Sequence, residues 1–164
     1  MRFLNSKLKI ENTILQNIAK KYGTPAYCYS YKQLKENIND FKKNFKSISP
    51  LICFAIKSNT NLNLIKEIKK FGLGADVVSM GELMLALKAG ISPKKIVFSG
   101  VGKTSKEINF AIDKNILLIN SESKSEIIEI DKIAKIKKKQ VNIGIRSVSY
   151  TNIRAIETTT DLVR

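Results

Sequence analysis

The chain has 164 residues, with 29 Lys and Arg against 14 Asp and Glu, and therefore a formal net charge of +15. It contains no His and two Cys, which excludes Ser–His–Asp and Cys–His catalysis, His-ligated metals and four-Cys zinc sites within these residues. Because no run of 18 apolar residues and no signal-peptide pattern occurs, we expect one cytoplasmic domain with no membrane partner.

The positive charge comes almost entirely from lysine, since the chain has 25 Lys and four Arg. Base recognition favours the planar guanidinium of Arg, and the lysines are scattered between apolar segments. The chain also has 24 Ile and 14 Asn, so A/T-rich codons account for the lysines without any partner. We therefore predict solvent-facing lysines and no nucleic-acid partner.

Two helices and one short strand are predicted before residue 50. The first helix begins at Asn12, whose side chain can act as its N-cap, and ends near Tyr22. A short apolar strand follows at 26–29. Ser30 and Gln33 form a capping-box signature for a second helix that ends near residue 45.

From residue 51 onward, apolar strands alternate with helices at intervals of about 20–25 residues. The predicted strands are 51–56, 75–78, 96–99, 116–119 and 141–146, and the predicted helices are 62–71, 81–89, 105–114 and 123–136. Near-continuous apolar strands are typical of a parallel sheet covered by helices. The fold class is therefore α/β with about five βα units, either a doubly wound sheet or an incomplete (β/α)8 barrel, which when closed takes roughly 250 residues.

In a parallel sheet, functional residues lie at the carboxyl ends of the strands and in the loops that follow them. Lys57 stands directly after an apolar strand. We expect it to be partly desolvated, which favours a neutral, nucleophilic amine; the alternative is a snorkelling surface lysine. Asp76 lies inside an apolar strand and needs a partner, for which Lys57 and Arg146 are the candidates.

The segment 100–104, Gly-Val-Gly-Lys-Thr, resembles the end of a phosphate-binding loop but lacks its first glycine, because Val97 stands there. It remains open whether its amides face an anion or whether it is simply a βα turn. Cys28 and Cys53 lie in apolar runs and are predicted to be small buried side chains.

Six segments, taken in order, resemble the diaminopimelate decarboxylases, which are pyridoxal phosphate (PLP) enzymes built on a barrel like that of alanine racemase. The segments cover much of the stretch from about 22 to 146: 23–29, 54–59, 74–83, 98–104, 120–123 and 143–146. They include Gly-Thr-Pro at 23–25, Lys-Ser-Asn at 57–59 and Ala-Asp-Val-Val-Ser at 75–79.

The resemblance implies that Lys57 is the catalytic lysine that holds PLP as a Schiff base. Asn59, Asp76 and Arg146 match positions that line or brace the cofactor pocket. The implied reaction is decarboxylation of meso-diaminopimelate to L-lysine and carbon dioxide, in lysine biosynthesis, with no metal. Two alternatives stay open: another PLP barrel enzyme, such as an amino-acid racemase or an ornithine/arginine-type decarboxylase, or a non-catalytic PLP-binding fragment.

The resemblance also implies parts that these residues do not contain: later barrel strands, a ring-stacking His, a phosphate-binding glycine loop and a second, β-rich domain. We therefore expect an N-terminal piece with a helix and strand at 1–29, a partial PLP-binding barrel domain at 30–146, and a divergent tail at 147–164 produced by a frameshift or truncation. Alone it should be inactive or nearly so. The homodimer implied for the family becomes doubtful for so short a chain.

Overall fold

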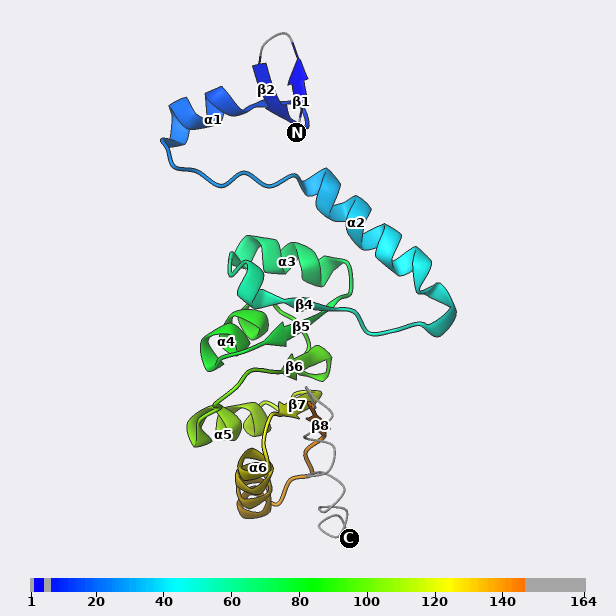
Figure 1. Cartoon of the computed structure of the whole chain (residues 1–164), viewed down its shortest axis with the longest axis vertical. Coiled ribbons are helices and arrows are strands. Elements are labelled where there is room, and N and C mark those ends of the chain that lie inside the picture. Colours follow the sequence, from blue (N-terminus) through cyan, green and yellow to red (C-terminus); the bar gives the residue numbers. More distant parts are fainter. Residues whose placement is uncertain (1, 5–6, 147–164) are drawn as a thin grey trace. The chain divides into compact units, whose positions relative to one another are not determined.

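A computed structural model describes residues 2–4 and 7–146, which form two compact units that divide after Pro50 (Figure 1). We describe each unit by itself. The segment 147–164, predicted to be a divergent tail, lies outside the described residues. The predicted domain limits at 29/30 and 146/147 stay predictions.

The first unit consists of a small antiparallel sheet and two helices. Its strands pair in the order β1-β2-β3, and its elements are β1 Arg2–Leu4, β2 Lys7–Ile10, β3 Thr13–Ile14, α1 Leu15–Tyr22, α2 Tyr31–Asn44 and the 3-10 turn η1 Lys46–Ile48. The short sheet was not predicted. Its β2 strand nevertheless alternates lysine with apolar residues, which is typical of a half-exposed strand.

Two predictions for the first unit are wrong. The first helix does not begin at Asn12, because β2 and β3 form a tight hairpin there, in which Ile10 pairs with Thr13; the helix begins at Leu15 without a side-chain cap. Residues 26–29 are not a strand, because no described strand pairs with them. An apolar run needs a neighbouring strand to become part of a sheet.

The second predicted helix of this unit is confirmed as α2. The Ser30 hydroxyl accepts a hydrogen bond from the Gln33 amide at 3.0 Å, so Ser30 is its N-cap. The Gln33 side chain donates to Asn37 at 2.9 Å, so the reciprocal half of the predicted capping box is not formed. The carboxylate of Glu11 binds the Ser30 hydroxyl at 2.7 Å and the Lys32 amide at 2.8 Å.

The second unit is a five-stranded parallel sheet in the order β4-β5-β6-β7-β8, with a helix between each pair of strands. Its strands are β4 Cys53–Ala55, β5 Gly74–Val77, β6 Ile96–Phe98, β7 Leu118–Ser121 and β8 Ile143–Ile145. Its helices are α3 Leu62–Lys70, α4 Met80–Lys88, α5 Ser105–Asp113 and α6 Lys124–Lys137, with 3-10 turns η2 Ile56–Ser58 and η3 Pro93–Lys95. This arrangement confirms the predicted series of βα units and the partial parallel barrel.

The strands β4 and β8 are shorter than predicted, and β7 is displaced by two residues. β7 begins at Leu118 rather than at Ile116, because the Leu117 amide bonds to carbonyls of Pro93 and Ile96 in the connection before the strand. Ile116 is buried in that connection, so its apolar character reflects packing of the turn rather than membership of the strand.

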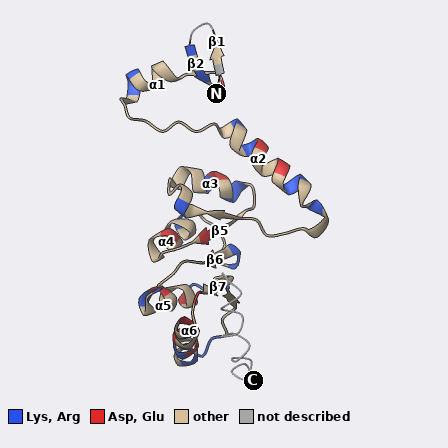
Figure 2. Ribbon diagram, viewed as in Figure 1, with Lys and Arg blue, Asp and Glu red and all other residues tan. Residues whose placement is uncertain are grey.

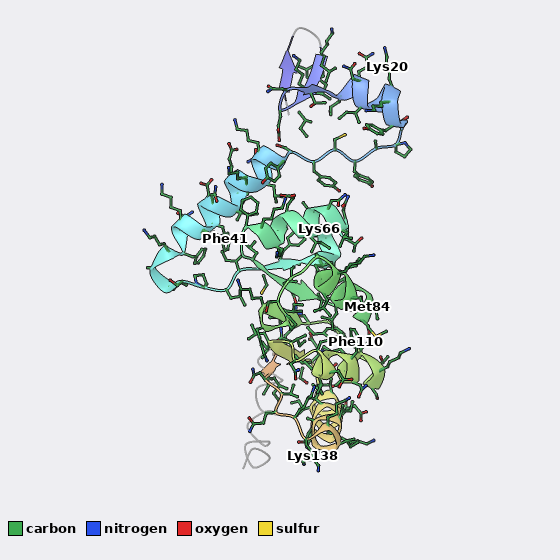
Figure 3. All side chains as sticks on the ribbon, turned by 180° about the vertical axis from the view of Figure 1, so that it is seen from behind. Lys20, Phe41, Lys66, Met84, Phe110 and Lys138 are labelled. Carbon is green, nitrogen blue, oxygen red and sulfur yellow. The ribbon has the colours of Figure 1, made fainter. Side chains whose placement is uncertain are left out.

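The core lies between the sheet and its helices, and the side chains on each strand alternate about it. Ala75, Val77, Phe98 and Ile119 point into this core, and α4 to α6 lie along the same side of the strands (Figure 1). The intervening residues, Asp76 among them, therefore face the side that these helices leave uncovered. Side chains such as Lys66 and Met84 stand on the exposed sides of α3 and α4 (Figure 3).

Charges of both signs are interspersed along α2 and α6 (Figure 2). In α6, for example, Asp131 pairs with Lys135 at 2.7 Å on an exposed surface. Among the described residues, no helix is long and apolar enough to cross a bilayer.

Candidate cofactor site

Three polar side chains meet where β5, β6 and β7 end, on the uncovered face of the sheet. The Ser99 hydroxyl donates to Asp76 Oδ1 at 2.6 Å and accepts a hydrogen bond from Asn120 Nδ2 at 3.0 Å. Each residue comes from a different strand or strand end, and neighbouring parallel strands bring them together. We call Asp76, Ser99 and Asn120 the strand-end network.

The partner of Asp76 is therefore not the one expected. Neither Lys57 nor Arg146 forms an ion pair with it, and the Ser99 hydroxyl satisfies its carboxylate instead. Ser99 is 23 residues further along the chain and is buried, so its hydroxyl has few alternative acceptors.

Lys57 lies on the η2 turn that directly follows β4, and this turn contacts β5 and α4. The prediction that its amine is partly desolvated is wrong, because the side chain is exposed. The strand ends at Ala55, and the 3-10 turn carries Lys57 beyond the sheet. Among the described residues no group forms a hydrogen bond or ion pair with the amine, which leaves it open to solutes.

Asn59 supports the same turn. Its backbone amide bonds to the Ile56 carbonyl at 2.9 Å, and its side-chain oxygen accepts from the Asn61 amide at 2.9 Å. Asn61 in turn caps α3 by accepting from the Asn63 amide at 2.9 Å. The turn that carries Lys57 is thus tied to the start of the next helix.

Arg146 stands directly after β8, with its backbone amide bonded to the Ser121 carbonyl at 3.0 Å. Its guanidinium lies 3.5 Å from the carboxylate of Glu122, which follows β7. The Arg146 side chain is 57% exposed, while that of Glu122 is 12% exposed. The structure therefore places Arg146 at the same end of the sheet as Lys57 and Asp76, but it does not bring the three side chains into contact.

Lys103 was not singled out from the sequence, yet it is the buried lysine of this end of the sheet. Its side chain is 1% exposed and pairs at 3.2 Å with Glu126, which is 8% exposed. The amine also donates to the carbonyls of Gly100, at 2.8 Å, and Asn120. The Glu126 carboxylate accepts from the Glu122 amide at 2.8 Å, while the Ser123 hydroxyl caps α6 by accepting from the Glu126 amide at 3.2 Å.

The last residue of segment 100–104 stands at the start of helix α5. Thr104 caps α5 in a complete capping box, and the Glu107 carboxylate binds the Thr104 amide at 3.0 Å and the Met80 amide at 3.0 Å. The Thr104 amide, together with the Met80 amide, holds the pKa of Glu107 below its usual value. Since the Glu107 carboxylate binds the Thr104 amide, this amide is not available to an anion, and the end of the segment is a capped βα turn.

The two cysteines are partly buried rather than fully buried. Burial, and then the charge of Asp76, raise the pKa of the Cys53 thiol, which disfavours the reactive thiolate. Cys53 is thus a packing residue, although it is buried only in part.

Comparison with known proteins supports the family resemblance that the sequence segments indicate. A profile of the pyridoxal-dependent decarboxylases, describing their pyridoxal-binding domain, matches residues 31–161 and so runs beyond Arg146. A diaminopimelate decarboxylase of Aquifex aeolicus is 43% identical over 146 residues, and one of Helicobacter pylori strain J99 is 44% identical over 131. These alignments cover 89% and 80% of this chain but 34% and 32% of the relatives, so the chain spans about a third of their length.

A solved structure shares the fold as well. The crystal structure of Helicobacter pylori diaminopimelate decarboxylase complexed with L-lysine superimposes with a TM-score of 0.77 and 41% sequence identity, over 80% of this chain and 34% of that one. A profile match over more than half of the chain, a shared parallel barrel sheet and this level of identity agree with one another. The chain belongs to the pyridoxal-dependent decarboxylase family and carries sequence of its pyridoxal-binding domain.

Proposed function

We propose that the chain forms the lysine-bearing part of a PLP-dependent decarboxylase that converts meso-diaminopimelate into L-lysine and carbon dioxide. The observation that carries the proposal is 43–44% identity to diaminopimelate decarboxylases over 80–89% of the chain. Because the chain spans about a third of these relatives, the substrate and the complete reaction belong to the proposal. The expectation that these 164 residues alone are inactive stays a prediction.

The residues at the carboxyl ends of the strands fit a phosphorylated aldehyde cofactor. Lys57 offers an exposed amine with no partner among the described residues, which an aldehyde can reach. Asp76 offers a carboxylate that is fixed by a hydrogen bond and only partly buried, and Arg146 offers a largely exposed cation at the same end of the sheet. When bound, PLP supplies an aldehyde carbon for attack by an amine and a ring that accepts the electron pair left by departing carbon dioxide.

Each of these site residues then has a defined task in the proposed reaction. Lys57 acts as the attacking amine in its neutral form and carries a proton when it is released. Asn59 keeps the turn of Lys57 anchored to α3 through Asn61. Asp76 presents a negative charge toward the uncovered face, and Arg146 binds negative charge of cofactor or substrate. The Ser99 hydroxyl keeps Asp76 in one orientation.

The cofactor part of the proposal can be tested without turnover. The chain is titrated with PLP, reduced with borohydride and digested, and the modified lysine is identified by mass spectrometry. We expect one preferred site at Lys57, with a long-wavelength absorbance that is lost in Lys57→Ala and kept in Lys66→Ala, a control at an exposed lysine of α3 (Figure 3). Equal labelling of many lysines, or unchanged absorbance in Lys57→Ala, would overturn the assignment.

The substrate is tested by adding amino acids to the PLP-loaded chain. A spectral change specific to meso-diaminopimelate supports the proposed reaction. A preference for ornithine or arginine, or for alanine, would indicate the alternative decarboxylase or racemase, and a loaded chain that responds to none would indicate a PLP-binding fragment. We further propose that the protein acts in the cytoplasm on a free amino acid, without a nucleic-acid partner, and that a homodimer forms in the complete barrel.

A further inference from the structure

We propose that Lys103 is a positioning residue, which fixes the ends of β6 and β7 so that Ser99 and Asn120 hold Asp76 in the cofactor site. The inference rests on the proposed function insofar as Asp76 belongs to that site. Lys103 itself does not face the site, since its side chain is 1% exposed and its amine is enclosed by protein groups.

The contacts of the amine lead directly to the strand-end network. One contact is the carbonyl of Gly100, the residue after Ser99, and another is the carbonyl of Asn120. Ser99 and Asn120 are the two residues whose side chains hydrogen-bond to each other at 3.0 Å. A single cation therefore binds the backbone beside both members of that hydrogen bond, across two adjacent strands.

Glu126 provides the negative charge that pairs with Lys103, and it connects helix α6 to the ends of β6 and β7. It comes from α6, lies 3.2 Å from the amine and accepts from the Glu122 amide, which follows β7. A buried charge of this kind holds its partners in one geometry, because moving any of them leaves an unpaired group in a dry environment. The Lys103–Glu126 pair thus limits how far the ends of β6 and β7 can separate.

The same contacts would be present if Lys103 only stabilised the fold. The stabilising role and the positioning role predict different effects on ligand binding. If Lys103 stabilises the fold alone, its loss affects ligand binding equally whether or not the network is intact. If it acts through the network, its loss matters only while the Ser99 hydroxyl is present. A double-mutant cycle separates the two cases.

The first experiment needs no ligand. The side-chain amide signals of Asn120 are followed by nuclear magnetic resonance and identified by their loss in Asn120→Asp. We expect Ser99→Ala and Lys103→Met to move them in the same direction. Lys139→Met is the matched control, because Lys139 also binds backbone carbonyls, of Ile112 and Asp113, but does so away from the network.

The second experiment is the cycle itself, with PLP affinity measured by absorbance titration and the urea midpoint measured in parallel. We expect Lys103→Met to weaken PLP binding roughly tenfold in the native background and less than about twofold in the Ser99→Ala background. The urea midpoint should fall in both backgrounds. If Lys103→Met does not fold, Lys103→Met/Glu126→Gln replaces it, since glutamine keeps an acceptor for the Glu122 amide without leaving a lone buried charge.

The outcomes separate this inference from the proposed function. Equal losses of PLP affinity in both backgrounds, or Asn120 signals that stay in place in Lys103→Met, would overturn the positioning role. A native chain that binds no PLP would overturn the cofactor proposal, and the Asn120 signals would then decide the role of Lys103 alone.

Discussion

The buried pair of Lys103 and Glu126 is the polar contact of the second unit whose disruption should cost most. Removing one charge leaves the other buried and unpaired, so Glu126→Leu should lower the free energy of unfolding by about 3–5 kcal/mol. The double variant Lys103→Met/Glu126→Leu should recover much of this loss, because neither charge then remains. Urea unfolding of the three proteins measures both effects, and a double variant less stable than the single one would contradict the argument.

Gly100 and Gly102, in the same turn, offer a matched pair of substitutions. Both have positive φ, of 101° and 72°, but a Cβ at Gly100 would lie 3.1 Å from the Val78 backbone oxygen, while one at Gly102 meets nothing within 4 Å. We expect Gly102→Ala to cost about 1 kcal/mol through backbone strain and Gly100→Ala about 3 kcal/mol through strain and overlap. Thermal unfolding compares them, and equal losses would show that the approach to Val78 is relieved by a small shift.

For individual residues, the sequence predicts the place in the fold better than the contacts of the side chain. Lys57, Asp76 and Arg146 all lie at the carboxyl ends of strands, as the alternation of strands and helices indicates. The partner of Asp76 depends on the register between β5 and β6, which brings Ser99 within 2.6 Å and which no local pattern specifies. The exposure of Lys57 depends on a 3-10 turn that begins at Ile56, so that the strand ends one residue earlier than predicted.

The start of α5 gives a prediction in acid. Hydrogen bonds from the Thr104 and Met80 amides lower the pKa of Glu107 from its usual 4.5, so ionised Glu107 stabilises the folded state. This contribution is complete above about pH 5 and is lost as the pH falls through the lowered value. The stability difference between the native chain and Glu107→Gln should therefore be largest near neutral pH and shrink in acid.

The measurement is urea unfolding of both proteins over a pH series. Glu36→Gln is a suitable control, because Glu36 is exposed and pairs with Lys32 at 3.9 Å on the surface of α2, where an ion pair contributes little. A difference for Glu107→Gln that stays constant from neutral pH into acid would show that its charge does not stabilise the helix start.

Helices and strands were predicted well where both local signals and tertiary partners agree. The four helices of the second unit have apolar faces that pack on the sheet, and three of them begin at a Ser or Thr cap: Ser79, Thr104 and Ser123. The failures have a common cause in the first unit, where β3 has two residues and segment 26–29 has no pairing strand. The structure of such short segments depends on neighbouring segments, which local sequence patterns do not specify.

For the molecule as a whole, the edge of the parallel sheet and the net charge act against each other. Among the described strands, β8 pairs with β7 alone, and its Ile143 and Ile145 are 39% and 55% exposed. An exposed apolar edge favours association between chains, whereas a net charge of +15 opposes it. Raising the salt concentration screens the repulsion, so self-association should increase with salt.

Sedimentation velocity at low and high salt tests this expectation, with Ile145→Lys as the variant that adds charge to the edge. We expect the variant to remain monomeric at salt concentrations where the native chain associates. A native chain that is monomeric at every concentration, or a variant that associates equally, would exclude the β8 edge as the contact.

Two carboxylates bind groups that belong to the preceding βα unit of the chain. Glu107 of α5 binds the first amide of α4, and Glu126 of α6 binds Lys103, which precedes α5. Homologous recombination that exchanged a single unit between related barrels would therefore separate a carboxylate from the group it binds. Viable chimeras should have their crossovers placed so that segment 80–107 and segment 103–126 are each inherited whole, which makes the stretch 80–126 the smallest exchangeable module in this part of the barrel.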